Sequence, residues 1–416
     1  MLSAAHHAAG ARATQRCRAL GIAPYSDLAD ALYRAWLTPA HKAALGALEG
    51  WMTEAGMAVR IDAMGNCIGR YEGTAPDAPT LLIASHIDSV KNAGCFDGPL
   101  GVMLGVECVS ALHAARRRLP FAIEVAAFGD EEGSRFPAAM LTSRAMAGTL
   151  DTADLAIADA QGTSVAEALA TFGLDIARAA EARLPYTPIA YLEAHIEQGP
   201  VLEAEGLALG TVTGIAAQLR YEVQVEGQAG HAGTTAMPLR RDALAGAAEM
   251  IAAIEEIARA AASDVVATVG RIEARPGAAN VIPGAVRFTI DVRSGAEGRR
   301  DAAAAGILAA IGAIAGRRGL AARWEEINNL PASPCAEPLM ALMDSAIAST
   351  GQRPFRLVSG AGHDAMVMAA LCPVAMLFIR CEKGISHNPA ENVEVADVAA
   401  GFAAMMAFID SLGDTL

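Results

Sequence analysis

The sequence has few basic residues. Lys and Arg together number 32 among 416 residues, against 46 Asp and Glu, so the formal net charge is −14. Binding to nucleic acid or to an anionic membrane surface needs clustered positive side chains that neutralise phosphates or headgroups. We therefore expect no nucleic-acid partner and no membrane partner, and we expect a small molecule as the ligand.

The sequence also lacks cysteine pairs and long apolar runs. Its seven cysteines are scattered and include no CxxC spacing, which argues against a disulfide framework and against a thiolate zinc site. The N-terminus has no apolar signal-like core, and no segment offers about 18 uninterrupted apolar residues. Free thiols in a reducing compartment are expected, and we predict a cytoplasmic protein.

What is present is typical of an α/β enzyme with two domains. Hydrophobic residues make up 53% of the chain, and 416 residues exceed the size of one ordinary core. Apolar runs alternate with helical patterns, which predicts a mixed, mostly parallel sheet covered by helices. The pattern indicates a helical region over 25–56 with Thr38 as N-cap, a hairpin-like pair over 59–73, buried strands over 81–88 and 122–132, and a helix over 101–118.

A different pattern begins near residue 214. Strand-like and helix-like segments follow in the order strand (220–227), helix (240–261), strand (265–274), strand (285–294), helix (298–319) and strand (320–327). This βαββαβ order is that of a ferredoxin-like split motif. We therefore predict an inserted domain over 214–329, and a first domain made of residues 1–213 and 330–416.

Ionisable residues follow the buried strands of the first domain. The candidates are His86, Asp97, Glu132, His195 and His387, each at the end of an apolar run or in a glycine-rich connection. Histidine and carboxylate together suit a borderline divalent cation. A lone histidine beside a strand is more often a structural residue, and an HxD spacing is common by chance. The sequence therefore indicates a metal site only because the five occur together.

The motifs around these residues resemble those of the M20 family of dinuclear metallohydrolases, in its hydantoinase/carbamoylase branch. The matching stretches are SHIDSVKNAGCFDGPLGV, DEEGSRF, EAHIEQGPVLE, GHAGTTAMPLRRDAL, NVIPGAVRFTIDVR, SGAGHDA and GISHNPAE. They span most of the chain. The resemblance implies a catalytic domain that binds two metal ions, and an inserted domain that forms a homodimer and closes as a lid.

The resemblance also implies roles for individual residues. His86 and His195 would bind one ion, Glu132 and His387 the other, and Asp97 would bridge the two. Zinc is the expected ion, with manganese, cobalt and nickel as alternatives. Glu131 would be the general base, and Asp88 would hold the second nitrogen of His86, although an Asp at that place also suits a loop cap.

Four further residues are candidate substrate contacts, and three of them, His231, Asn280 and Arg293, match positions that in relatives complete the active site across the dimer. Gln198 offers an amide that can donate to and accept from a ureido group, and it also suits a loop-stabilising role. His231 is the implied stabiliser of the oxyanion, and Asn280 and Arg293 are the implied ligands of a substrate carboxylate. Arg293 is equally suited to a salt bridge at a strand end. The roles of Asp130, His363 and Asp364 stay open.

These implications lead to one functional prediction and three alternatives. The chain is predicted to hydrolyse the ureido C–N bond of N-carbamoyl-L-amino acids, which are small carboxylate-bearing substrates, to amino acid, carbon dioxide and ammonia. Allantoate shares the ureido group and the carboxylate, so an allantoate amidohydrolase is the first alternative. A peptidase or N-acyl-amino acid deacylase of the same family is more distant, since His195 argues against it. A dimer that binds metal without catalysis is the third.

Overall fold

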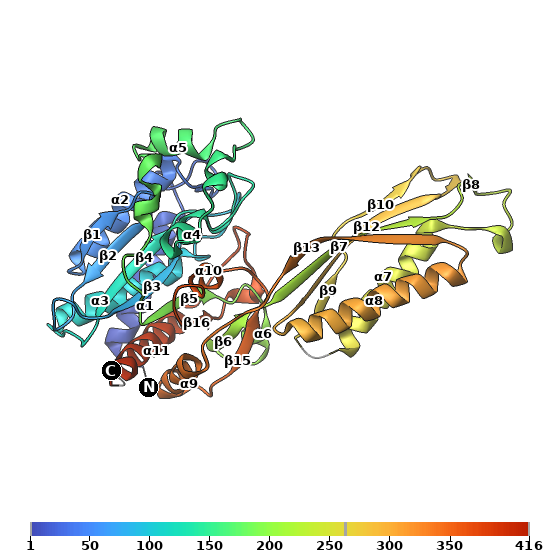
Figure 1. Cartoon of the computed structure of the whole chain (residues 1–416). Coiled ribbons are helices and arrows are strands. Elements are labelled where there is room, and N and C mark those ends of the chain that lie inside the picture. The colour runs from blue at the N-terminus through green and yellow to red at the C-terminus, as the bar shows by residue number, and fades with distance from the viewer. Residues whose placement is uncertain (1, 262–263, 415–416) are drawn as a thin grey trace. The chain divides into compact units, whose positions relative to one another are not determined.

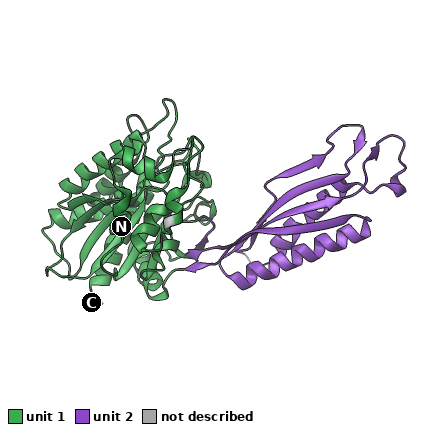
Figure 2. Cartoon of the chain, turned by 45° about the horizontal axis from the view of Figure 1, so that its top comes forward, with its two compact units in different colours: residues 1–213, 335–357, 362–416 green, residues 214–334, 358–361 purple. Residues whose placement is uncertain are grey.

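The computed structural model describes residues 2–261 and 264–414 of the chain. The chain divides into two compact units (Figure 2). Unit 1 contains Met1–Thr213, Cys335–Leu357 and Gly362–Leu416, and unit 2 contains Gly214–Pro334 and Val358–Ala361. Unit 2 thus extends to Pro334, beyond the boundary at 329 that we expected. It also includes a short return segment, because the main-chain oxygens of Ser359 and Gly360 accept hydrogen bonds from Ala216 and Arg293 of unit 2.

A nine-stranded sheet lies mainly in unit 1 (Figure 1), and only its short strand β14 and the ends of β6 and β15 belong to unit 2. The order is β1-β2-β4-β3-β5-β16-β6-β14, with β15 also paired to β6. The strands are β1 (Ala58–Ile61), β2 (Cys67–Tyr71), β3 (Thr80–His86), β4 (Ala122–Phe128), β5 (Ala190–Ile196), β6 (Leu209–Ile215), β14 (Ser333–Pro334), β15 (Arg356–Ser359) and β16 (Val374–Ile379). Parallel pairing joins β4, β3, β5 and β16. The sheet is mixed as predicted, but the strands that flank these four pair antiparallel, so "mostly parallel" describes only its middle.

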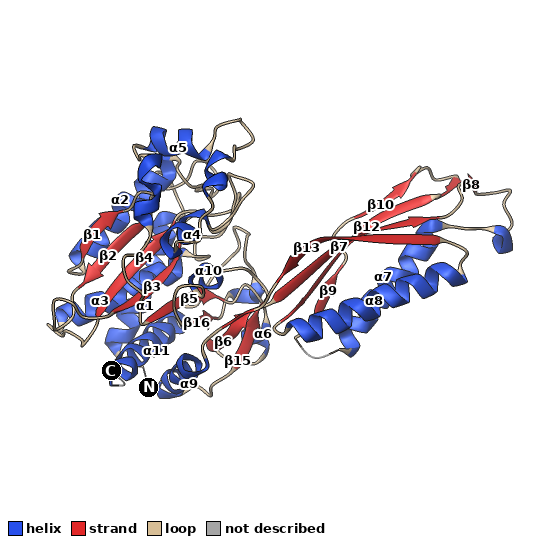
Figure 3. Ribbon diagram, viewed as in Figure 1, coloured by secondary structure: helices blue, strands red, loops and turns tan. Residues whose placement is uncertain are grey.

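Helices cover this sheet (Figure 3). They are α1 (Ala4–Leu20), α2 (Pro39–Glu54), α3 (Pro99–Ala114), α4 (Leu141–Ala147), α5 (Val165–Phe172), α6 (Val201–Ala204), α9 (Glu337–Ser349), α10 (Asp364–Met368) and α11 (Val395–Asp414), with short 3-10 turns at Thr152–Ala156, Ile176–Ala182 and Glu382–Gly384. Leu81 and Ile83 of β3 join α1, α3 and α11 in the main core. Because side chains alternate along a strand, His86 lies on the opposite face from Leu81 and Ile83.

Two local predictions are corrected by the structure. Only Pro39–Glu54 of the expected helical region 25–56 forms a helix, with Thr38 as N-cap as predicted. The segment before it is held by a network of turns around Ser26 and Arg34, which a periodicity argument does not detect. In unit 2, the single strand expected over 265–274 is split into β9 (Val266–Thr268) and β10 (Ile272–Arg275), both paired with β12.

Helix α11 is long and apolar enough, by length and composition, to cross a membrane. Two-thirds of its most apolar window is buried, however, and it packs against α1 and α9. Phe402, Met405 and Phe408 of this helix are all part of the main core of unit 1. This is the pattern of a core helix.

Unit 2 contains an antiparallel sheet with two long helices, α7 (Ala243–Ala260) and α8 (Glu297–Arg317). The strand order is β10-β12-β7-β13, where β7 is Ala217–Glu226, β12 is Ala285–Ser294 and β13 is Ala321–Leu330, and β9 also pairs with β12. A separate pair joins β8 (Gly230–His231) and β11 (Val281–Ile282), and a 3-10 turn spans Met237–Leu239. Apolar residues of β7, β12, α7 and α8 form a core within this unit.

The buried guanidinium of Arg34 holds the end of β3 in place. It donates from Nε to the carbonyl of Ile87 at 2.6 Å, and from Nη1 to the carbonyls of Leu20 at 2.7 Å and Tyr25 at 2.9 Å. Ile87 directly follows His86, so this fork fixes the chain where the strand ends. Arg34 is 0% exposed.

We expect Arg34→Lys to lower the thermal unfolding midpoint by several degrees. An ammonium group cannot reproduce the planar fork that reaches three carbonyls, and each lost charged hydrogen bond costs about 1.5–3 kcal/mol. Arg12→Lys is the matched control, because Arg12 is half exposed on its partner Glu107. Equal midpoints for the two variants in a thermal shift assay would contradict this role of Arg34.

Candidate metal centre

The ends of four parallel strands bring the candidate ligands together. His86 is the last residue of β3, His195 is the second-to-last residue of β5, and Glu131 and Glu132 follow β4. Asp97 lies in the loop before α3, and His387 lies in the loop after β16. In sheets of this type, ligands bind beyond the carboxyl ends of the strands. The fold therefore gathers at one edge residues that are up to 301 positions apart, counted from His86 to His387.

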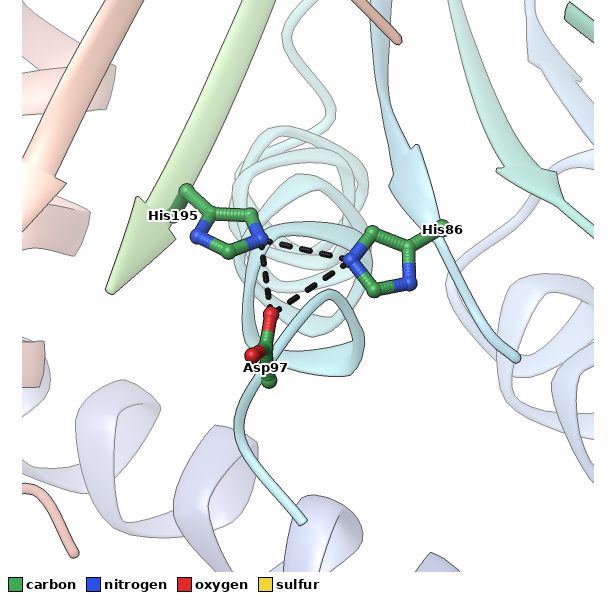
Figure 4. A group of neighbouring side chains, drawn as sticks. All are labelled: His86, Asp97 and His195. Carbon is green, nitrogen blue, oxygen red and sulfur yellow. Dashed lines mark hydrogen bonds and ion pairs between the residues drawn. The ribbon is translucent and has the colours of Figure 1, made fainter. Parts of the chain in front are cut away.

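Two histidines and one carboxylate form the first cluster, which Figure 4 shows. Nε2 of His86 lies 3.4 Å from Nε2 of His195, and Oδ1 of Asp97 lies 3.5 Å from the first and 3.2 Å from the second. His86 and His195 are each 1% exposed, and Asp97 is 5% exposed. The two Nε2 atoms and Oδ1 thus face one another inside the protein.

A second cluster shares Asp97. Nε2 of His387 lies 3.3 Å from Oδ2 of Asp97 and 3.3 Å from Oε1 of Glu132. The two oxygens of Asp97 therefore face different clusters. His387 is the most exposed of these side chains, at 48%, so the second cluster lies nearer to solvent than the first.

Both clusters fit a divalent ion. Four ligands at about 2.0–2.2 Å in a tetrahedron lie about 3.3–3.6 Å from one another. Four of the five separations above fall in that range, and the fifth, 3.2 Å between His195 and Asp97, is just below it. Oδ1 of Asp97 is buried without a hydrogen-bond partner in the described part of the chain, which is costly unless a cation lies there. Burial acts to raise the pKa of Asp97, but the imidazoles of His195, His387 and His86 hold it well below its usual range.

The two buried imidazoles are oriented by acceptors on their far side. Nδ1 of His195 lies 2.9 Å from the carbonyl of Ile196, and Nδ1 of His86 lies 3.3 Å from the carbonyl of Asp88. A carbonyl accepts a hydrogen bond, so Nδ1 of each ring carries the proton in the neutral form. The lone pair of each Nε2 is then directed into the cluster, as a metal ligand requires.

The Asp88 carboxylate contacts the backbone of Glu131 and Glu132 as well as the ring of His86. Its two carboxylate oxygens accept hydrogen bonds from the backbone N–H groups of Glu131 and Glu132, each at 3.1 Å, and Oδ1 lies 3.4 Å from Nδ1 of His86. Oε2 of Glu131 lies 4.0 Å from Nε2 of His86. Burial raises the pKa of the Glu131 carboxyl well above its usual range. A carboxyl of raised pKa beside two clusters of ligands is suited to accept and return a proton.

Gln198 faces the clusters directly. Its amide donates to Oδ2 of Asp97 at 2.8 Å and to Ser386 at 3.3 Å, while its Oε1 is buried without a partner in the described chain. Ser386 also donates to Oδ2 of Asp97. Gln198 and His387 both adopt positive φ angles, of 58° and 54°, which is uncommon for residues with side chains and occurs mainly where surrounding structure enforces it.

The residues with open roles are buried around this centre. His363 is 1% exposed, and its ring lies edge-on to that of His195 at 4.5 Å between centroids. Asp130 and Asp364 are both 0% exposed, and burial raises the pKa of Asp364 to about 8. The carboxylate of Glu193 accepts from Ser85, Tyr191 and the backbone of Ala365. These contacts fix the strand residues that precede His86 and His195.

The remaining predicted site residues lie in unit 2, at two separate places. His231 and Asn280 are exposed beside each other, since Val281 pairs with His231 and the carbonyl of Asn280 accepts from Ala232. Arg293 is near the other end of β12, paired in register with Gln218. It forms an ion pair with Asp291 at 2.8 Å, which is the structural role that the sequence also allowed. Along the strands, the separation between His231 and Arg293 is about 25 Å.

Sequence reasoning missed Glu391 and Ser386. Glu391 is 5% exposed and accepts from the backbone N–H groups of Phe96 and Asp97. It is the glutamate of the GISHNPAE motif, four residues after His387. An acid so close to a candidate ligand could have been identified from the sequence as a residue that supports the site. Ser386 precedes His387, and nothing in the sequence distinguishes it from an ordinary loop serine.

Comparisons with known proteins agree with this geometry. The model of peptidase family M20/M25/M40 matches residues 82–411. The N-carbamoyl-L-amino acid amidohydrolase of Geobacillus stearothermophilus is 46% identical over 352 residues, which cover 84% of this chain and 86% of that protein. Allantoate deiminase 1 of Glycine max is 38% identical over 418 residues, which cover 93% and 86%. The crystal structure of a hydantoinase/carbamoylase family amidase from Burkholderia multivorans has a TM-score of 0.89 and 34% identity, and the match covers 97% of each chain.

Gly98 is required beside His86. It adopts a φ of +82°, and a Cβ at this position would lie 2.5 Å from the ring of His86. We expect Gly98→Ala to lower the bound metal content of the purified protein at least tenfold, since tilting the ring removes one ligand. Gly50→Ala is the matched control because no atom lies within 4 Å of the added methyl group. Equal metal content in both variants, measured by atomic emission, would contradict the role of His86 as a metal ligand.

Proposed function

The chain belongs to peptidase family M20/M25/M40, and from that premise we propose that it is an amidohydrolase that cleaves the ureido C–N bond of N-carbamoyl-L-amino acids. The observation that carries this proposal is the 46% identity to an N-carbamoyl-L-amino acid amidohydrolase over 84% of this chain. The products are the amino acid, carbon dioxide and ammonia. Both kinds of relative, the N-carbamoyl-L-amino acid amidohydrolase and the allantoate deiminase, are named for hydrolysis of a C–N bond that is not a peptide bond.

Allantoate is the second candidate substrate. The allantoate deiminase of Glycine max aligns with 93% of this chain, which is a longer match at lower identity. Allantoate carries a carboxylate and a ureido group, so the same residues serve either substrate. A peptidase or deacylase activity has less support, since the relatives compared above are named for ureide or amidase substrates.

We propose that two divalent ions bind at this centre. His86 and His195 would hold one, Glu132 and His387 would hold the other, and Asp97 would be shared between them. Zinc suits these ligands, and manganese, cobalt and nickel also do. A pair of such ions supplies an activated water and polarises the carbonyl of the ureido group.

The protein residues then move the proton. Glu131 takes one proton from the attacking water as the water oxygen bonds to the carbamoyl carbon. Glu131 returns this proton to the terminal nitrogen as the C–N bond breaks, and ammonia leaves. The remaining carbamate decomposes to carbon dioxide and the amino acid. Asp88 keeps Glu131 in reach by accepting the hydrogen bond of its backbone N–H.

We further propose that unit 2 is a ferredoxin-like lid through which the enzyme forms a homodimer. Its element order and its strand order support the first part. The edge strand β13 supports the second, because Trp324, Ile327 and Leu330 on it are 42%, 53% and 40% exposed, and long apolar edges favour pairing with another chain.

The spacing inside unit 2 also supports a site shared by two chains. His231 on β8 and Arg293 on β12 are separated by about 25 Å along the strands of unit 2, and an N-carbamoyl amino acid is much shorter than that. One substrate therefore cannot contact both residues of the same chain. If both bind substrate, as proposed for oxyanion stabilisation by His231 and carboxylate binding by Arg293 and Asn280, they serve different active sites of the dimer.

We place this enzyme in the cytoplasm. All seven cysteines are free, and six of them are buried. A reducing compartment suits such thiols.

Ammonia release by the metal-loaded protein tests the reaction. We expect turnover of N-carbamoyl-L-amino acids to exceed that of allantoate, and Glu131→Gln to reduce kcat by at least about 100-fold because the proton acceptor is lost. Faster turnover of allantoate would reassign the substrate and keep the mechanism. Absence of ammonia from either substrate, with metal bound, would refute the proposed function.

Subunit mixing tests the shared site. Glu131→Gln and His231→Ala homodimers are each expected to be nearly inactive. Random exchange of equal amounts produces heterodimers in half of the population, and one of their two sites has both Glu131 and His231. Recovered activity should then be about a quarter of wild type. If His231 serves the site of its own chain, no site is restored and activity stays at the level of the homodimers.

A further inference from the structure

Glu391 connects the two loops that carry ligands of both clusters. It lies in the loop after β16, four residues beyond His387, and its side chain reaches the loop that contains Asp97. Oε1 accepts hydrogen bonds from the backbone N–H of Phe96 at 2.7 Å and from that of Asp97 at 3.1 Å. The carboxylate therefore grips the main chain at the residue that the clusters share.

The Glu391 loop is shaped for this contact. The side chain of Asn388 accepts from the backbone N–H of Ala390 at 2.9 Å, and the backbone N–H of Glu391 donates to the carbonyl of Asn388 at 3.0 Å. The backbone N–H of Glu382 donates to the carbonyl of Asn392 at 2.8 Å, which closes the base of the loop. Glu391 is thus presented inward by a turn that does not depend on the Asp97 loop.

The two loops are closely packed at this contact, with no room for a side chain at Gly94. A Cβ on Gly94 would lie 2.3 Å from Cβ of Glu391 and 2.4 Å from its Oε1. Oε2 of Glu391 is buried and has no hydrogen-bond partner in the described part of the chain. The hydrogen bonds that hold this side chain are therefore those to the Asp97 loop, so they set both its position and that of Asp97.

We propose that Glu391 is a positioning residue that fixes the rotation of Asp97, so that each oxygen of that carboxylate faces its own ion. The inference rests on the proposed function in one respect, which is that Asp97 holds two ions. Rotation of the Asp97 backbone would move Oδ1 and Oδ2 together. Loss of the Glu391 contact must therefore weaken both ions, whereas damage limited to the His387 loop would weaken only the ion held by Glu132 and His387.

Metal titration of the full-length protein tests the inference. Cobalt(II) is titrated into metal-free protein, and both binding constants are followed by absorbance and by competition with a chromophoric chelator. We expect Glu391→Ala to weaken both constants by about 10–100-fold, as is typical when a partner of a ligand is removed. Glu391→Gln should restore most of the affinity, because its amide oxygen accepts the same two N–H groups.

Two controls keep the result interpretable. Glu394→Gln removes an exposed acid three residues away and should leave both constants unchanged. Circular dichroism and the unfolding midpoint of the metal-free variants report folding. If Glu391→Ala does not fold, Glu391→Asp takes its place, because a side chain one methylene shorter keeps the charge and loses the reach.

Three outcomes overturn the inference: unchanged constants in the folded variant, weakening of one ion alone, or failure of Gln to restore affinity. None of them depends on turnover. Wild-type protein that binds two ions and releases no ammonia would refute the proposed function and leave the role of Glu391 standing.

Discussion

The carboxylate of Asp97 is the feature on which the rest of the centre depends. Its two oxygens face different clusters, with His86 and His195 on one side and Glu132 and His387 on the other. These residues come from four separate segments of the chain, and Asp97 is the side chain that both clusters share. A centre of this kind tolerates little error, because three of the five separations between candidate ligand atoms involve Asp97.

Three buried acids hold the ligands in place by accepting hydrogen bonds from backbone N–H groups, or from a strand hydroxyl, next to the ligands. Asp88 accepts from the backbone of Glu131 and Glu132, Glu391 accepts from the backbone of Phe96 and Asp97, and Glu193 accepts from Ser85, next to His86. Hydrogen bonds to charged acceptors are shorter and stronger than neutral ones. The geometry of the ligands is therefore set largely through the backbone to which they are attached.

Such an arrangement also explains the backbone around the site. Gly98 stands where the ring of His86 leaves no room for a side chain, and Gln198 and His387 adopt left-handed conformations despite having side chains. Conformations of this kind cost free energy and persist where the surroundings enforce them. Here Gln198 contacts Asp97 and Ser386, and His387 contacts Asp97 and Glu132. These contacts hold the loops that follow β5 and β16.

Local patterns in the sequence were sufficient for the strands and for the candidate ligands that the structure gathers at their ends. Continuous apolar runs predicted β3 and β4, and the acids and histidines that follow them indicated a metal site. The contacts of Glu391 and Arg34 were not predictable, because they join residues 295 and 53 positions apart. The strand split between β9 and β10 was also missed, since the two segments are only three residues apart and pair with the same strand.

An anomalous-difference map from crystals grown with zinc or cobalt is the most direct test of the central claim. The account predicts two peaks about 3.5–4 Å apart, one bounded by His86 and His195 and the other by Glu132 and His387, with Asp97 between them. A single peak under saturating metal, or two peaks that do not share Asp97, would contradict it.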